Sequence, residues 1–159
     1  MRFETDGEYP EHWVYKTIGD VCTKLTSGGT PSRRRPDFYE NGTVGWIKTK
    51  ELKDGPISNS EEYITHSAIK NSSAKLLPPS TVLMAMYGAT VGMLGVLEKE
   101  MACNQACCAM IFDSELAYYR YVFYLLLNER QRIKSLATGA AQQNLSGKQI
   151  SQFEFLFPP

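Results

Sequence analysis

Three consecutive arginines are the strongest chemical signal in this sequence. Arg33, Arg34 and Arg35 follow the stretch SGGTPS, residues 27–32, and precede the stretch PDFY. A guanidinium group donates hydrogen bonds in a planar fork that suits carboxylate and phosphate oxygens. The triplet therefore predicts either a solvated loop or a loop that contacts an anion with many phosphates, such as a DNA backbone.

Other polar residues could extend the same surface. Lys48 and Lys50 are two residues apart, so on a strand they would share one face and either protect an edge or add to a basic patch. The amides of AQQN, residues 141–144, could read adenine or tie down the backbone of their own loop. Tyr87 precedes a glycine at a turn, and we expect it to be a core residue rather than a base-contacting aromatic.

Catalytic and metal-binding motifs are absent from the sequence. It has no GxxxxGK[ST] phosphate loop, HExxH or GxSxG, and GATVGMLG does not match GxGxxG. The four cysteines show no paired Cys-x-x-Cys, so we expect reduced, buried thiols rather than a zinc site. The neighbouring carboxylates Glu61 and Glu62 lie in a turn-rich segment and are expected to be solvated. We therefore predict no catalytic site and no metal site.

The charge of the chain is balanced overall but uneven along its length. The 159 residues carry a formal net charge of zero. Residues 16–53 hold eight basic and four acidic side chains, and residues 114–148 hold five basic and two acidic ones. A neutral protein can thus present a local basic patch, which is what attracts phosphates. No apolar run approaches the roughly 18 residues of a membrane span, and the acidic N-terminus does not resemble a secretory signal, so we predict a cytoplasmic protein without a membrane contact.

Hydrophobic periodicity predicts strands first and a long helix late. Residues 12–25 fit a strand or a short helix, and residues 26–43 and 54–61 read as a loop and a turn. Thr65 is expected to cap a short helix ending at Lys70, and Ser146 another short helix. The patterns predict strands at residues 43–52, at 76–98 (two strands around Gly88), at 101–112 and at 153–159. Leu116, Tyr119, Phe123 and Leu126 fall at helical spacing, which predicts a helix over 115–137 with Ser114 as N-cap. This order indicates an α+β domain.

Seven segments in a fixed order resemble one known family. They are W...IGDVC, SGGTPSR, GWIKTKEL, SSAKLLPPSTVLMAMYGATVGMLGV, CNQACCAM, ATGAAQQNLSGKQI and FEFLFPP. Together they are similar to a target recognition domain of the DNA-specificity subunit of type I restriction–modification systems, from about Trp13 to the end of the chain.

The resemblance implies a β-rich, double-β-helix-like fold and a non-catalytic role. Each such domain would read one half of a bipartite target in double-stranded DNA and would position methyltransferase and restriction subunits. Those partner subunits, and not this chain, would use S-adenosylmethionine, ATP and Mg²⁺, so no cofactor of its own is expected. Together with the charge pattern, the resemblance gives these candidate DNA-binding residues: Arg33, Arg34, Arg35, Lys48, Lys50, Gln142 and Lys148. The shared motifs would instead shape loops, through Gly28, Gly29, Thr30, Pro31, Gly88, Asn104, Gln105, Gln143 and Asn144.

The resemblance also defines the expected domain limits. Residues 1–12 would be an N-terminal extension, and residues 13–159 one recognition domain. The spacer helix of the family would begin where Pro158-Pro159 ends this sequence, and a second recognition domain is missing, so we expect a half subunit, a truncated gene product or a trimmed chain. The alternative function is a protein-interaction or inhibitory fragment. It would dock on the methyltransferase subunit without reading DNA, through the tyrosines at 118, 119, 121 and 124.

Overall fold

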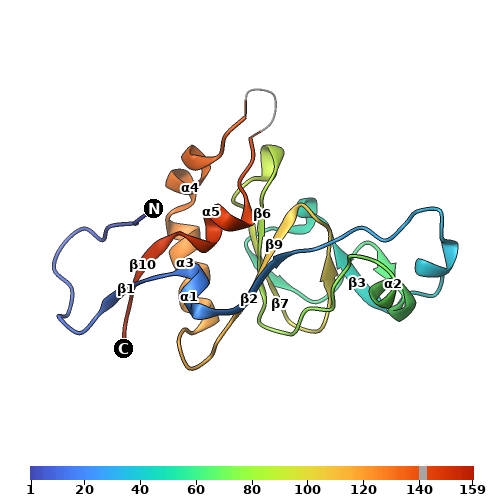
Figure 1. The fold of residues 1–159 in the computed structure, drawn as a ribbon, viewed down its shortest axis with the longest axis horizontal. Coiled ribbons are helices and arrows are strands. Elements are labelled where there is room, and N and C mark those ends of the chain that lie inside the picture. The colour runs from blue at the N-terminus through green and yellow to red at the C-terminus, as the bar shows by residue number, and fades with distance from the viewer. Residues whose placement is uncertain (140–142) are drawn as a thin grey trace.

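Three sheets organise the described part of the chain, residues 1–139 and 143–159 of a computed structural model (Figure 1). The largest has the order β2 (Cys22–Ser27), β9 (Cys107–Phe112), β6 (Val82–Ala85), β7 (Leu94–Leu97) and β4 (Gly55–Ile57). A smaller one has the order β5 (Tyr63–Ile64), β3 (Val44–Ile47) and β8 (Ala102–Cys103). The third pairs β1 (Val14–Thr17) with β10 (Glu154–Phe157). Among these strands β4 and β7 run parallel, as do β3 and β8, and the other pairs are antiparallel.

Helices lie mainly at one end of the molecule and the arginines at the other. The α-helices are α1 (Ile18–Val21), α2 (His66–Lys70), α3 (Tyr119–Asn128), α4 (Arg130–Leu136) and α5 (Gly147–Ser151). The 3₁₀ turns are η1 (Pro36–Phe38), η2 (Thr49–Glu51) and η3 (Gly88–Thr90). In Figure 1 both termini and α1, α3 and α5 lie on the left, whereas the light-blue loop with the arginines lies at the far right, beyond β3. The sequence-based prediction of a mixed α and β fold is confirmed.

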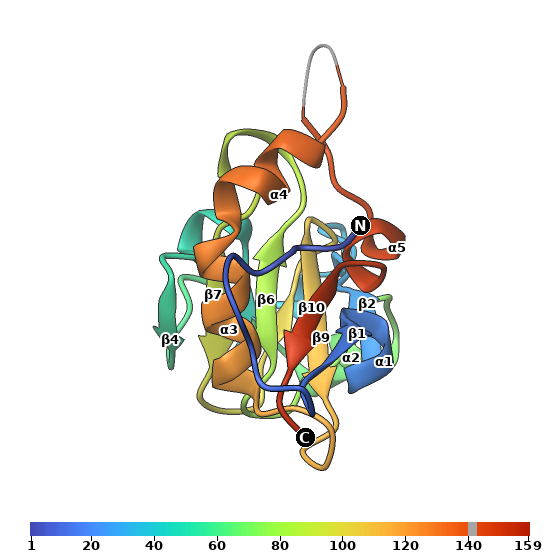
Figure 2. The ribbon, with the colours of Figure 1, turned by 90° about the vertical axis from the view of Figure 1, so that its left-hand side faces the viewer.

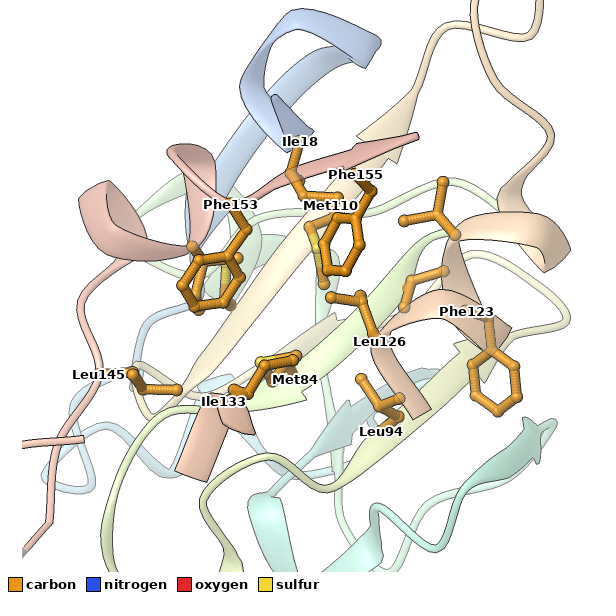
Figure 3. Close-up of a cluster of buried hydrophobic side chains, with 14 of the residues drawn as sticks. Ile18, Met84, Leu94, Met110, Phe123, Leu126, Ile133, Leu145, Phe153 and Phe155 are labelled. Atoms are coloured by element: carbon orange, nitrogen blue, oxygen red, sulfur yellow. The ribbon is translucent and has the colours of Figure 1, made fainter. Parts of the chain in front are cut away.

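The central strands β6 and β9 are buried on both faces, which explains their unbroken apolar sequences VLMA and CCAM. Because side chains alternate across a strand, Val82 and Met84 enter one cluster of buried residues while Leu83 and Ala85 enter another. The first cluster is closed by α3, α4 and β10, which cross the face of the large sheet in Figure 2. Figure 3 shows its side chains, in which Phe155 and Leu126 lie close to Met110.

The predicted helix over 115–137 is wrong in its start and in its continuity. Residues 113–117 form a turn instead. The Asp113 carboxylate accepts a hydrogen bond from the Glu115 N–H at 2.9 Å, and the backbone carbonyl of Asp113 accepts one from the Ala117 N–H at 2.9 Å. Ser114 is therefore not an N-cap. The helical segment that follows is two helices, since Glu129, with φ −92° and ψ 10°, separates α3 from α4. Arg130 then anchors α4 to the large sheet by donating to the Asp54 carboxylate.

Other elements match the sequence more closely. Thr65 caps α2 and accepts from the Ala68 N–H at 3.2 Å, and Ser146 caps α5 with a reciprocal bond to Gln149. The two strands around Gly88 and the last strand are also present. Residues 12–25 contain both predicted alternatives, because β1, α1 and β2 follow one another. The predicted turn at 54–61 contains the short strand β4.

The first residues of the chain pack onto the domain. The Phe3 ring is 2% exposed and stacks on Phe155 at 4.6 Å between ring centres. Arg2 donates to the Glu154 carboxylate at 2.7 Å. The segment predicted as an N-terminal extension thus completes the core beneath β10.

The cysteines are free thiols, and Cys103, Cys107 and Cys108 are buried as predicted. Cys22 is partly buried, and its desolvation raises the pKa of this thiol to about 12. A thiol with such a pKa stays protonated and is a poor nucleophile at neutral pH. In the portion of the chain with described positions, no helix is long and apolar enough to cross a membrane.

Candidate nucleic-acid interface

Arg33 is held by one carboxylate and two aromatic rings. Its Nη1 and Nη2 donate to the two oxygens of Glu62 at 2.7 and 3.1 Å. Its guanidinium carbon lies 4.6 Å from the ring centre of Tyr39 and 5.1 Å from that of Trp46. Lys48 Nζ donates to the same carboxylate at 2.5 Å. The hydrogen bonds from Arg33, and then that from Lys48, lower the pKa of Glu62 to about 2, so this group is ionised at neutral pH and its one negative charge is shared by the two cations.

Arg35 is paired locally, whereas Arg34 is not paired within the described residues. Nε and Nη2 of Arg35 donate to the Asp37 carboxylate at 2.8 and 2.7 Å, which lowers the pKa of Asp37. The guanidinium carbon of Arg35 lies 4.4 Å from the ring centre of Phe38. Arg34 donates from its backbone N–H to Ser32 Oγ at 3.3 Å, and its exposed side chain meets no carboxylate in the described part of the chain. Of the three arginines, Arg34 is the one that presents an uncompensated charge to solvent.

Lys48 and Lys50 do not share one face of a strand, and that prediction is wrong. Strand β3 ends at Ile47, and Lys50 lies in the 3₁₀ turn η2. The reason is Glu51, whose carboxylate accepts from the Lys48 N–H at 2.8 Å and closes this turn. Lys50 is exposed and donates to Glu61 at 2.7 Å, while Lys48 has a side chain only 18% exposed.

Two glycines fix the base of the arginine loop. Gly28 and Gly29 donate from their N–H groups to the carbonyls of Cys107 and Cys103, at 3.3 and 3.0 Å. A Cβ atom on Gly28 would lie 2.0 Å from the Cys103 carbonyl oxygen, and one on Gly29 would lie 2.2 Å from Ser73 Oγ. Only glycine fits at either position without displacing neighbouring atoms.

The remaining residues of the SGGTP and CNQ motifs meet at the same place. Thr30 Oγ1 donates to the Gln105 side chain, and the Asn104 N–H donates to the carbonyl of Ile47 at 2.9 Å. Tyr39 Oη donates to the Pro31 carbonyl at 2.6 Å. The structure thus joins two predicted loop-shaping segments, about 75 residues apart in the sequence, into one support for the arginine loop.

The other predicted residues gather elsewhere, beside α5. Gly88 adopts φ +69° and donates to the Gln143 carbonyl at 2.8 Å, and Tyr87 forms a β-bridge with Asn144. The Tyr87 side chain is 37% exposed, so its expected place in the core is wrong. Lys148 is exposed on α5. The predicted contact Gln142 lies outside the described residues.

Within the described ranges, no group of three or more His, Cys, Asp or Glu side chains could hold a metal ion.

The family model for the type I restriction modification DNA specificity domain matches residues 10–159. The chain belongs to this family. The chain is 27% identical over 149 residues to the specificity subunit of the type I restriction enzyme EcoR124I/EcoR124II of Escherichia coli, a match that covers 91% of this chain and 36% of that protein. It is also 27% identical over 160 residues to the MjaIX specificity subunit of Methanocaldococcus jannaschii, with 98% of this chain and 36% of that protein covered.

Solved structures of the same family share the fold. The HsdS subunit of Thermoanaerobacter tengcongensis superposes with a TM-score of 0.72 at 17% identity, and covers 98% of this chain and 36% of that one. The S subunit of M. genitalium gives 0.63 at 18% identity, with 91% and 34% covered. The chain thus spans little more than a third of the length of the specificity subunits it matches.

Sequence reasoning missed the partners of the arginines. Glu62, expected to be solvated, bonds to both Arg33 and Lys48 and has a side chain 32% exposed. Nothing in the local sequence marks Tyr39 and Trp46 as the rings that support the Arg33 guanidinium group. Only Asp37 carried a signal, because a carboxylate two residues after Arg35 can reach it locally. The pairing of Arg33 with Glu62 spans 29 residues, and no local pattern reveals it.

Proposed function

We propose that this chain reads DNA sequence for a type I restriction–modification complex. It would recognise one half of a bipartite target and help to position the methyltransferase and restriction subunits on it. The observation that carries the proposal is the family match over residues 10–159. The fold shared with solved specificity subunits supports the same domain type.

The domain recognises and does not catalyse. Methylation with S-adenosylmethionine, and ATP- and Mg²⁺-dependent cleavage, would belong to partner subunits, and the chain needs no cofactor of its own. Residues 13–159 would form the recognition domain, in the double-β-helix-like arrangement of its family, and residues 1–12 would extend it. The complex would act in the cytoplasm.

The residues of the arginine loop fall into two groups, those that maintain its conformation and those that can contact DNA. Phosphate contacts place a protein on the duplex, and contacts to base edges select the sequence. Arg34 is suited to a phosphate contact, because its charge is not offset within the described residues. Arg33 and Arg35 already donate to carboxylates, so they keep the loop in shape and contact DNA only if those pairs open. The rigid base at Gly28 and Gly29 holds this loop in one position against the sheet.

Selection from a random duplex library tests the proposal. The chain is incubated with randomised duplexes at two salt concentrations, with and without its cognate methyltransferase subunit. We expect enrichment of a short half-site and an affinity that falls as salt rises. Failure to bind DNA in either condition, while the methyltransferase subunit is still captured, would refute the proposal and favour the interaction fragment.

A further inference from the structure

An open groove of about 800 Å³ lies between the end of β2, the end of β6 and helix α5. Its walls include Ser27, Tyr87, Asn144 and Lys148, and its described lining contains no Asp or Glu. The hollow beside Tyr118 also lacks carboxylates, but it has no basic residue in its lining either, and other hollows do contain acidic residues. The one beside α3 includes Asp54 among its lining residues, and the one under the N-terminal segment is lined by several carboxylates. The groove at α5 is therefore electrostatically suited to an anion.

Tyr87 is held in this groove by hydrogen bonds of its neighbours. The Leu145 N–H donates to the Met86 carbonyl at 2.8 Å, and the Gly88 N–H donates to the Gln143 carbonyl at 2.8 Å. The backbone on both sides of Tyr87 is thus fixed, while its ring remains 37% exposed. A large aromatic side chain on a fixed backbone loses little conformational entropy on binding, which favours a specific contact.

Two ammonium groups flank the groove. Lys148 projects from α5, which packs against the first helix and is capped by Ser146. Lys75 Nζ donates to the Ser27 carbonyl at 2.7 Å at the other side. Neither lysine forms an ion pair with a described carboxylate. Ser27, the last residue of β2, thus lies between the groove and the Lys75 ammonium group.

We propose that this groove is a second DNA contact of the domain, which rests on the function proposed above. Lys148 binds a phosphate of the duplex, and Tyr87 contacts a base edge in the major groove. The ring can pack on a thymine methyl group, and the hydroxyl can exchange a hydrogen bond with a base. A duplex fits better than an acidic peptide, because the proposed function already brings DNA to this domain and an exposed aromatic ring beside a lysine offers one contact to a base and one to a phosphate.

The test separates the two assigned roles by their different readouts. The full chain is compared with Lys148→Gln and Tyr87→Ala, and with Lys99→Gln and Tyr9→Ala, which change exposed side chains outside the groove. Lys148→Gln is expected to lower the slope of log affinity against log salt by about 0.9, as for one lost phosphate contact, and to leave the enriched sequence unchanged. Tyr87→Ala is expected to weaken binding to the enriched half-site about tenfold and to relax the preference at one base position.

Controls identify which hypothesis fails. Tyr87→Phe keeps the ring and should retain most of the affinity, which guards against a folding defect in the alanine variant. If the wild type selects a half-site and both groove variants behave like their controls, the groove inference is wrong while the proposed function stands. If the groove variants lose only the methyltransferase subunit, the groove is a protein interface and the inference is overturned. If the wild type binds no DNA, both the inference and the proposed function fail.

Discussion

Single alanine substitutions of Arg33 and Arg34 should have opposite effects on stability and DNA binding. Arg33 bonds to Glu62 and lies over two aromatic rings, whereas Arg34 has an exposed side chain without a described ionic partner. The two residues are adjacent and chemically identical, so each variant is a matched control for the other. Any difference between them must come from what their side chains contact.

The structure sets the expected magnitude for each variant. Arg33→Ala removes an ion pair whose side chains are 56% and 32% exposed, worth up to about 1 kcal/mol, and two cation–π contacts worth about 0.5 kcal/mol each. We expect the free energy of unfolding to fall by about 1–2 kcal/mol and the melting temperature by about 2–8 °C. Arg34→Ala should change the stability by less than about 0.5 kcal/mol. It should lower the salt slope by about 0.9, which weakens binding about eightfold at 0.1 M salt relative to 1 M.

Two assays on each variant measure its stability and the salt dependence of its DNA binding. Urea unfolding followed by tryptophan fluorescence reports stability, and Trp46 lies beside Arg33 as a local probe. Fluorescence anisotropy with a labelled duplex of the selected half-site, over a salt series, gives the slope. The reasoning is refuted if Arg33→Ala lowers the slope without loss of stability while Arg34→Ala leaves the slope unchanged.

Three further predictions concern the scaffold. The carboxylate of Glu62 has a pKa near 2, below its ordinary value of 4.5, so its pairs stabilise the fold above pH 4.5 and are lost as the pH falls toward 2. After discounting for its exposure, Glu62→Gln should cost about 1 kcal/mol at pH 7 but little at pH 2.5 in urea unfolding. Glu40→Gln is the control, because Glu40 is exposed and forms no ion pair among the described residues. An equal cost of Glu62→Gln at both pH values would contradict this account. Gly28→Ala should destabilise the fold by about 3 kcal/mol, whereas Gly55→Ala, with open space around it, should not, and equal melting temperatures would disprove the close approach. Phe3→Ala should cost about 3–5 kcal/mol, and an unchanged unfolding midpoint would show that the first residues do not belong to the core.

Local signals in the sequence predicted the elements whose causes are local. Thr65 and Ser146 cap helices because a hydroxyl bonds to a backbone N–H three residues later, which depends on nothing distant. The central strands were recognisable because short apolar runs flanked by glycine and other turn residues are consistent with buried strands. The same kind of reasoning failed at residues 114–137. In that segment one periodic pattern spans both helices. Asp113 closes a turn before the first helix, and Glu129 separates the two helices. Hydrophobic periodicity predicts neither feature.

The candidate site was less predictable, because long-range pairs decide which charges are available. The three arginines are evident in the sequence. Whether Arg33 is paired or exposed depends on Glu62, which lies just before β5. Lys48 shares that carboxylate for the same reason. Tyr87 precedes a glycine at a turn, and this local pattern does not show that the residue pairs with Asn144 and remains 37% exposed.

The arginine loop combines a closely packed base with an exposed charged side chain. Gly28 and Gly29 approach neighbouring atoms so closely that no side chain fits, and Tyr39 and Trp46 bond to the carbonyls of Pro31 and Gly29. Substitutions at these positions alter packing and cost stability. The exposed side chain of Arg34 packs against nothing that holds the fold, so its replacement changes the charge of the surface at little cost to the core. If the chain reads DNA as proposed, a substitution at Arg34 would change a DNA contact while the base of the loop stays the same.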